Sequence, residues 1–546
     1  MEDYGMPDRV IFSGKITELP PRILTTFNYR THSLGQLNDL ETLYDYRFPD
    51  ETAKRSFFLL SVNLLCWLKF ERMNPKLYDA DYFPSMDDSD LKPVYLPENN
   101  YVIHLVAYSV SPELLEQLYY AKSDFIGRFV EIDGCHTLLV HPSLRDDVLF
   151  QRLGCTLSSR KFYFLPAASP RTGLTWELGR EQDAFFTKLS FRGQNPQPNP
   201  KSDLSFPGSE EGKTSVYKSS TILALDHPSK SSFLTDEFYT QLKPEVISLT
   251  GHSYGVLFRK IPKSQLTDGT IIPFFSLAYT PVDGSKPLLV KFIEDSGLSI
   301  ERYFESYFYD SVIRFIIANS LTGIYADHLH GQNLLIKLLL NTSSYPDKIK
   351  FTSLSPEVFY RDTNDLKIFI ESEMPEYTTF RKKIAAPESK ATPGSYLYLA
   401  ATDFIKRSIV PILMALERWQ LRGFLSDRTR VNFSSYSHFI LPFYTKIINL
   451  QELSINQPGS TTANYDYNTL GEFTAFLLQE IRMTQGSRRE RQWMKEAGEI
   501  AKTAIANAKI TPVIDMARYE RLREYSELFQ QVYDQRTSDL DRPRVC

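Results

Sequence analysis

Residues 321–335, LTGIYADHLHGQNLL, place an acid, two histidines, a glutamine and an asparagine between two apolar flanks. Helical spacing precedes this run and strand-like spacing follows it. Taken alone, such a run is typical of a metal site, of a nucleotide site, or of a polar turn whose side chains cap nearby backbone. The surrounding sequence has to decide among these three.

The segment before the run has apolar residues at helical spacing, namely Ile300, Phe304, Tyr307, Phe308, Val312 and Phe315. This stripe predicts a helix that ends near residues 319–323, because Asn and Gly favour helix ends. After the run, LLIKLLL (334–340) and EVFYRDTNDLKIF (357–369) predict two strands around a turn. The run therefore joins a helix to a strand pair.

Further upstream, short β-rich segments bounded by Gly, Pro and Asp predict an antiparallel or mixed sheet. An earlier strand is expected at YVIHLVAYSVS (101–111), and FFLLSVNLLCWLKF (57–70) is expected to be a buried helix. The later segments are TLLVHP (137–142), KFYFLP (161–166), FFTKLSF (185–191), STILALDHP (220–228), YGVLFRKIP (254–262), IIPFFSLAYTP (271–281) and PLLVKFIED (287–295).

Length and composition indicate a soluble protein of several lobes. At 546 residues the chain is too long for one core. We predict an α+β fold with an α/β lobe over 1–140, a catalytic core over 141–395 and a helical domain over 396–546, where Pro411 favours a kink. Polar breaks at 192–214, 385–395 and 456–468 are expected to be loops or boundaries.

Charge and cysteine usage exclude several classes. The net charge of −4, with no long Lys/Arg run, argues against a nucleic-acid partner. The four cysteines share no close spacing, which argues against a Cys-rich zinc site and a disulfide framework. The amino terminus is unlike a signal peptide, and the longest apolar run is too short to cross a bilayer. We therefore expect a cytoplasmic protein with no membrane partner.

The polar run and a later acid could bind Mg²⁺. Asp327, Asn333 and Asp362 offer the hard oxygen ligands that Mg²⁺ prefers, and a histidine could neutralise a phosphate oxygen. Arg361 is available for a phosphate or for a structural ion pair. The alternative, a turn whose side chains cap nearby backbone, stays open at this point.

Cationic groups lie upstream. Ser169, Arg171 and Thr172 form a predicted tight turn after a strand, and Lys188 stands inside an apolar strand. A lysine there is costly to bury unless an anion or a carboxylate pairs with it. Cations that hold phosphates and oxygens that hold a metal are complementary halves of a Mg-nucleotide site.

Five short segments occur in a recognisable order: HP (141–142), PAASPRT (166–172), TKLSF (187–191), HGQN (330–333) and FYRD (359–362). This order resembles the NRPS-independent siderophore synthetases, the IucA/IucC-like family. That family shows an HPWQ-like element, then PTxSxRT, KLxL, EAHxQN and a YRD-like element. The resemblance covers about residues 135–370.

The resemblance implies a hand-like, multi-lobed fold and an ATP- and Mg²⁺-dependent ligase. Family members adenylate a carboxylate, often of citrate, and an amine or alcohol then attacks the acyl-adenylate to give an amide or an ester. The implied partners are thus small-molecule carboxylates and amines or alcohols. Because relatives are commonly dimers, the resemblance implies a homodimer, although the sequence itself fixes no oligomeric state.

The resemblance also implies residue roles on the phosphate side. Ser169, Arg171 and Lys188 would contact the ATP phosphates, and Thr172 would shape the turn. His330 would touch a phosphate. Lys188, Arg171 and His330 would then form the catalytic set. The physical argument agrees, because adenylate formation needs charge neutralisation at the α-phosphate.

On the metal side, the resemblance implies that Asn333 and Asp362 ligate Mg²⁺ and that Gln332 supports the site. The sequence departs from the family at the motif glutamate two positions before the histidine. Either Asp327 or His328 takes that place, depending on which flank is aligned. Asp327 is then the third candidate metal ligand.

Other departures bear on the substrate. The HPWQ-like element reads HPSL (141–144), and the family's amino-terminal HPxHPxxK element is absent before residue 141. Two alternatives follow. One is a non-catalytic relative that binds a nucleotide or a small acid. The other is an aminoglycoside-kinase-type phosphotransferase, although no Gly-rich loop and VAIK-like lysine support it.

Overall fold

The computed structural model of the chain describes residues 46–71, 100–120, 126–169, 171–191, 209–224, 231–247, 254–280, 285–321, 324–326, 328–341, 350–368, 400–401, 403–426, 439 and 442–443. These residues form helices and antiparallel strands, so the predicted α+β class is confirmed. The chain packs as two compact units. The first comprises residues 1–288, 332–355 and 359–364, and the second comprises 289–331, 356–358 and 365–546.

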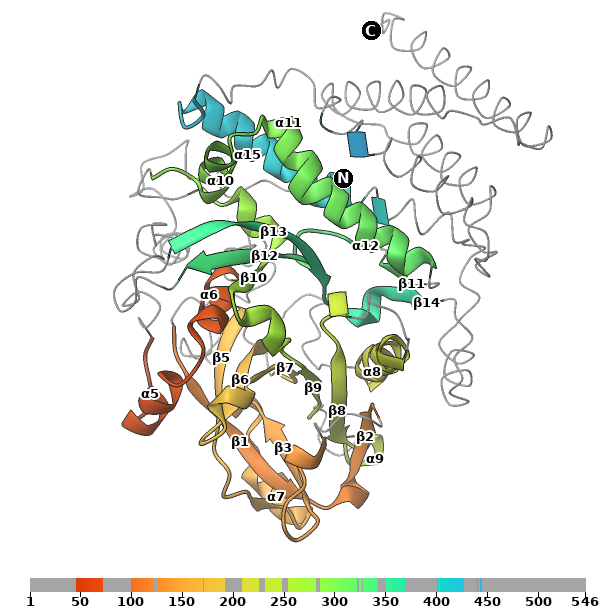
Figure 1. Cartoon of the computed structure of the whole chain (residues 1–546). Helices are drawn as coiled ribbons and strands as arrows, with labels where there is room; N and C mark the ends of the chain where they lie inside the picture. The colour runs from red at the N-terminus through yellow and green to blue at the C-terminus, as the bar shows by residue number, and fades with distance from the viewer. Residues whose placement is uncertain are drawn as a thin grey trace, which may run out of the picture. The chain divides into compact units, whose positions relative to one another are not determined.

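A nine-stranded antiparallel sheet forms most of the first unit (Figure 1). Neighbouring strands follow the order β2-β8-β9-β7-β6-β5-β1-β3, and β4 pairs with β1. The strands are β1 (Ile103–Val110), β2 (Leu115–Tyr119), β3 (His136–Val140), β4 (Thr156–Leu157), β5 (Phe162–Ser169), β6 (Thr172–Glu177), β7 (Phe185–Leu189), β8 (Asp236–Leu242) and β9 (Val256–Arg259). Strands on both sides of residue 141 thus share one sheet, while the predicted three-part division stays a prediction.

Both faces of this sheet are covered, because successive side chains of a strand point to opposite faces. On one face, Phe162, Phe185 and Phe258 belong to a core that also includes Phe129 and Phe150. The other face has a separate core, whose members on β5, β6 and β7 are Tyr163, Leu165, Ala167, Leu174, Trp176 and Phe186. Two buried faces explain why these strands read as nearly continuous apolar runs.

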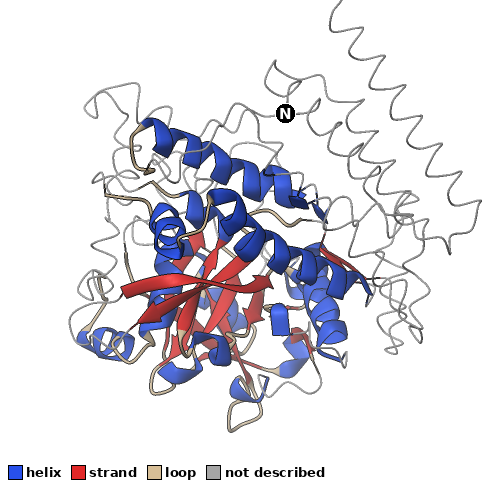
Figure 2. Cartoon of the chain, turned by 45° about the horizontal axis from the view of Figure 1, so that its top comes forward, coloured by secondary structure: helices blue, strands red, loops and turns tan. Residues whose placement is uncertain are grey.

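Side chains from helix α6 (Val62–Glu71) and from a smaller sheet complete the second core. The strands of the smaller sheet lie in the order β10-β12-β13. Figures 1 and 2 show strands of the smaller sheet crossing those of the large one. Trp67, Ile271 and Leu335 supply buried side chains from α6, β10 and β12. The smaller sheet consists of β10 (Gly269–Pro273), β12 (Leu334–Asn341) and β13 (Lys350–Tyr360).

Four further helices belong to the first unit. The long helix α8 packs against β8 and β2 (Figure 1). The predicted buried helix at 57–70 is confirmed over residues 62–70, which lie in α6, whereas residues 58–61 form a turn with Phe58 and Leu59 exposed. The helices are α5 (Glu51–Phe57), α7 (Asp147–Arg152), α8 (Ser209–Ala224) and α9 (Pro244–Ile247).

In the second unit, the predicted helix over 300–319 is confirmed. Ser299 caps its first turn, with its hydroxyl accepting from the Arg302 N–H at 3.3 Å. The helix contains a π-helical turn, and a second π-turn directly precedes the helix that carries Pro411. The elements are α10 (Leu288–Ser296), α11 (Ile300–Tyr303), η12 (Phe304–Tyr309), α12 (Asp310–Leu321), β11 (Ile324–Ala326), β14 (Leu366–Ile368), η14 (Ile405–Ile409) and α15 (Val410–Leu421).

Two predicted strands are wrong. Residues 220–224 lie in α8 and residues 288–295 lie in α10. In α10, buried Leu288, Leu289, Phe292 and Ile293 recur at helical spacing, so the segment buries one stripe of a helix. The expected loop at 192–214 is also partly helical, because α8 begins at Ser209.

Several expectations fall outside the described residues. They concern the breaks at 385–395 and 456–468, residues 192–208, and the helical tail beyond residue 443. Across the part of the chain that is described, no helix combines the length and apolarity needed to cross a membrane.

Candidate functional site

The predicted phosphate-binding residues gather at one end of β5, β6 and β7. Ser169 and Thr172 are paired across the tight turn between β5 and β6. Thr172 in turn lies opposite Lys188, and the Leu189 N–H donates to the Arg171 carbonyl at 2.8 Å. Thr172 and Lys188, which stand 16 positions apart in the sequence, thus become cross-strand neighbours. The side chain of Ser169 lies outside the described residues.

Lys188 points to the sheet face that carries the second core. It is half-buried and shares this face with Phe186, two residues earlier. On β9 it lies opposite Leu257, so Arg259 is its diagonal neighbour, at a backbone distance of about 7–8 Å. The face therefore presents two cationic side chains from adjacent strands.

The predicted metal-binding residues lie at the beginning of β12 and directly after β13. The Arg361 N–H donates to the Asn333 carbonyl at 3.0 Å, and Arg361 Nε donates to the Gln332 carbonyl at 2.8 Å. Asn333 is buried, while Asp362 is half-buried. These bonds bring Asn333 and Asp362 together from positions 29 residues apart.

Electrostatics link the two halves through Arg259. Burial by itself would lower the pKa of this guanidinium, but the carboxylates of Asp236, Asp362 and Glu71 outweigh burial and raise it. Asp236 binds Arg259 directly, with contacts of 2.8 and 3.2 Å. The hydroxyl of Thr363, the residue after Asp362, also lies 3.1 Å from Asp236 Oδ2. The metal-side segment is thus joined through Asp236 to Arg259, the diagonal neighbour of Lys188.

The side-chain oxygens of Asn333 and Asp362 fit a Mg²⁺ ion that is bound together with a nucleotide. Within the described ranges there is no group of three or more His, Cys, Asp or Glu residues that could hold a metal ion. Mg²⁺, however, is commonly bound through one or two carboxylates together with substrate phosphates and water. One carboxylate and one amide beside cationic side chains suit a metal that arrives with a nucleotide.

For two further predicted site residues, Asp327 and His330, no described contact places them on the sheet face of Lys188. Asp327 lies outside the described residues. His330 is half-buried and belongs to the second unit, with its ring centroid 6.4 Å from that of His328. In the same unit, Ser408 Oγ donates to the Leu329 carbonyl at 3.0 Å, which fixes the segment that leads into Gln332.

Three residues of this region, Glu71, Asp236 and Arg259, had no site role in the sequence-based prediction. Asp236 and Arg259 form a buried ion pair, and Glu71 pairs with Arg361. Arg361 was expected either to hold a phosphate or to form a structural ion pair, and the structure shows the ion pair. The one sequence signal for Asp236 is the acidic pair Asp236–Glu237 at the start of β8, because buried charges require partners.

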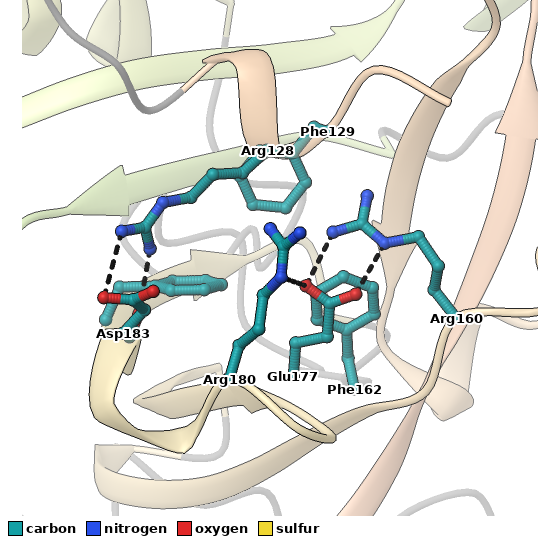
Figure 3. A pocket seen from close by; sticks show the side chains of 8 residues that line it. Arg128, Phe129, Arg160, Phe162, Glu177, Arg180 and Asp183 are labelled. Atoms are coloured by element: carbon teal, nitrogen blue, oxygen red, sulfur yellow. Dashed lines mark hydrogen bonds and ion pairs between the residues drawn. The ribbon is translucent and has the colours of Figure 1, made fainter. Parts of the chain in front are cut away.

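A separate small cavity lies on the opposite face of the large sheet. Figure 3 shows Arg160 and Arg180 directed at Glu177, and Arg128 directed at Asp183. Arg160 binds both oxygens of Glu177 at 2.7 Å. Glu177 lies opposite Phe162, which belongs to the first core rather than to the face of Lys188. This cavity is therefore distinct from the candidate site.

The histidine of the HP element, His141, is buried and stabilises a turn. His141 is fully buried, and its Nδ1 accepts from the Ser143 N–H at 3.1 Å. Its ring makes edge contacts with Phe164 and Phe191. Burial lowers the pKa of His141 to about 3. The ring is therefore neutral in the folded protein and caps the short turn that follows it.

The fold is that of siderophore synthetases of the IucA/IucC type, which confirms the predicted resemblance at the level of structure. The structure of aerobactin synthetase IucC from a hypervirulent pathotype of Klebsiella pneumoniae matches with a TM-score of 0.50 and 14% identity. The match covers 86% of this chain and 81% of that chain. At this identity the match shows the fold alone, and it makes this chain a divergent example of that fold.

Two other solved structures are similar at 14% identity. ATP-bound aerobactin synthetase IucA from the same Klebsiella pathotype has a TM-score of 0.46, with 84% of this chain and 79% of that chain covered. The petrobactin biosynthesis protein AsbB from Bacillus anthracis has a TM-score of 0.42, with 69% and 73% covered. No family model and no curated protein matches the sequence.

Proposed function

We propose that the protein is an ATP- and Mg²⁺-dependent carboxylate ligase of siderophore biosynthesis. The observation that supports this most is the chain of contacts that runs from Arg259, the diagonal neighbour of Lys188, through Asp236 to Thr363, the residue after Asp362. These contacts occur in a fold shared with aerobactin synthetase IucC. The substrates would be a carboxylic or polycarboxylic acid such as citrate and an amine or an alcohol.

The proposed reaction has two steps. A substrate carboxylate oxygen attacks the α-phosphorus of ATP, which forms an acyl-adenylate and releases pyrophosphate. An amine or hydroxyl then attacks the acyl carbon, AMP leaves, and the nucleophile loses a proton, so that an amide or an ester results. Both steps concentrate negative charge on phosphate oxygens, which pre-positioned cations can stabilise.

The cationic residues of the chain would have different parts in this reaction. Ser169 and Arg171 at the tight turn and Lys188 on the neighbouring strand β7 would bind the phosphates, and Thr172 would shape the turn. Arg259 is neutralised by Asp236, so we assign it no direct contact with phosphate. His330 would approach a phosphate from the segment that leads into Gln332.

The metal side would be formed by Asn333 and Asp362, with Asp327 as the third candidate ligand. A bound Mg²⁺ would supply charge neutralisation at the phosphates. Gln332 would support the site through its backbone, because its carbonyl is bound by Arg361. We further propose a cytoplasmic location and a homodimer, with small molecules rather than nucleic acids or membranes as partners.

The alternative is a non-catalytic relative that binds a nucleotide or a small acid. The observation that favours it is the changed position of the family glutamate, which leaves Asp327 or His328 in its place. A phosphotransferase has no such support in the described residues, and we rank it below both.

A hydroxamate screen tests the proposal. Purified protein is incubated with Mg-ATP, hydroxylamine and a panel of carboxylates, and both the trapped hydroxamate and pyrophosphate are measured. The proposal expects carboxylate-dependent release of both products. Lys188→Ala and Asn333→Ala should abolish it while the far-UV circular dichroism stays unchanged, whereas Arg152→Ala, an exposed arginine on α7, should leave it intact. ATP binding without turnover would favour the non-catalytic alternative.

A further inference from the structure

Asp362 has a backbone conformation that side-chain-bearing residues rarely adopt. Its φ is +72°, in the left-handed region, and Asn100 is the one other non-glycine residue with a positive φ among those described. Such a conformation costs energy and persists where surrounding contacts over-determine it. The contacts of its two neighbours show how this conformation is maintained.

The residue before Asp362 is fixed by a buried carboxylate. Arg361 donates through its guanidinium to Glu71 Oε1 and to the Gln332 carbonyl, and through its N–H to the Asn333 carbonyl. Glu71 is 1% exposed, and its Oε1 also accepts from Trp67 Nε1 at 2.7 Å. Helix α6 thus fixes the beginning of β12 and the end of β13 through one ion pair.

The residue after Asp362 is fixed by a second buried carboxylate. Thr363 is fully buried, and its hydroxyl lies 3.1 Å from Asp236 Oδ2, 3.1 Å from the Ser215 carbonyl and 3.0 Å from Ser219 Oγ. The backbone N–H of Asp236 in turn donates to Ser219 Oγ at 2.9 Å. These contacts join the segment after β13 to α8 and β8.

We propose that Glu71 and Asp236 are positioning residues that hold Asp362 and Asn333 in the geometry needed to bind one cation. Glu71 acts through Arg361, and Asp236 acts through Thr363, so Asp362 is fixed from both sides. Oxygen ligands that must converge on a small octahedral ion tolerate little displacement. The inference rests on the proposed function, because the cation would be the metal of Mg-ATP.

Binding of Mn²⁺ together with ATP tests this inference without requiring turnover. Free Mn²⁺ is measured by electron paramagnetic resonance during titration with protein and ATP. The variants are Glu71→Ala and Thr363→Val, which each remove one contact to the neighbours of Asp362. Loss of contacts that orient a metal ligand weakens metal affinity by about 10- to 100-fold, so each variant should bind Mn-ATP that much more weakly. Glu71→Gln and Thr363→Ser should restore much of the affinity, since each keeps an oxygen at the same place.

Glu177→Ala is the matched control. It breaks a partly buried ion pair on the opposite sheet face, with the Glu177 and Arg160 side chains 16% and 19% exposed, against 1% and 12% for Glu71 and Arg361. We expect this variant to bind Mn-ATP like the wild type. Equal loss in Glu177→Ala, or wild-type affinity in both Glu71→Ala and Thr363→Val, would overturn the inference while leaving the proposed function standing. A folded wild-type protein that bound no Mn-ATP would overturn both.

Discussion

The ion pair between Asp236 and Arg259 permits a quantitative prediction for Asp236→Ala. Asp236 is 1% exposed, and the Arg259 side chain is 16% exposed. Removing the carboxylate leaves a buried guanidinium without its two bonds and removes an acceptor of the Thr363 hydroxyl. Breaking a buried pair in this way costs about 3–5 kcal/mol, and we expect the free energy of unfolding of the first unit to fall by that amount.

Urea denaturation measures this loss. Trp67 and Trp176 are buried in the core on the same sheet face and report on the first unit by their fluorescence. The control is Arg145→Ala, which breaks the exposed pair between Arg145 and Asp147, with side chains 52% and 39% exposed, and keeps the bond from the Tyr108 hydroxyl to Asp147. An exposed pair contributes about 0–1 kcal/mol. A loss below about 1 kcal/mol for Asp236→Ala would refute the assignment of a buried, mutually dependent pair.

Two further predictions concern stability. His141→Leu should reduce the loss of stability at acid pH. The pKa of His141 is about 3 in the folded protein and about 6.5 in the unfolded chain. The free energy of unfolding of the wild type therefore falls by about 1.4 kcal/mol per pH unit as the pH falls from about 6.5 toward 3. Urea titrations at several pH values test this, and parallel curves for variant and wild type would contradict it. Gly173→Ala should destabilise the turn that carries Arg171, because a Cβ there would collide with the Leu165 carbonyl and lie 2.8 Å from the Phe164 ring. Thermal melts compare it with Gly127→Ala, whose Cβ would meet nothing within 4 Å, and equal melting temperatures would contradict the packing.

The local sequence pattern was sufficient to predict many of the helices and strands. The strands around residues 103–110, 162–169 and 185–189 follow short apolar runs bounded by turn residues, and each occurs in the structure. The helix over 300–319 follows from its long apolar stripe. Residues 220–224 and 288–295 were assigned wrongly because short apolar runs fit a buried helix as well as a buried strand. Only tertiary packing distinguishes the two.

The candidate site shows the same division between local and long-range information. Residue types and chain order pointed to Lys188, Asn333 and Asp362 without any contact being known. The partner of Arg361 could not be predicted, because Glu71 lies 290 positions earlier on α6. The pairing of Asp236 with Arg259 depends on strand order, since β8 and β9 become neighbours only when the sheet forms.

The phosphorus products of one reaction test the central claim most directly. Purified protein, Mg-ATP, a polycarboxylate such as citrate and a diamine are incubated together, and the products are followed by phosphorus NMR. The account predicts AMP and pyrophosphate in equal amounts, formed only when the carboxylate is present and lost in Lys188→Ala. ADP as the nucleotide product, or no nucleotide consumption with any carboxylate and nucleophile offered, would contradict it.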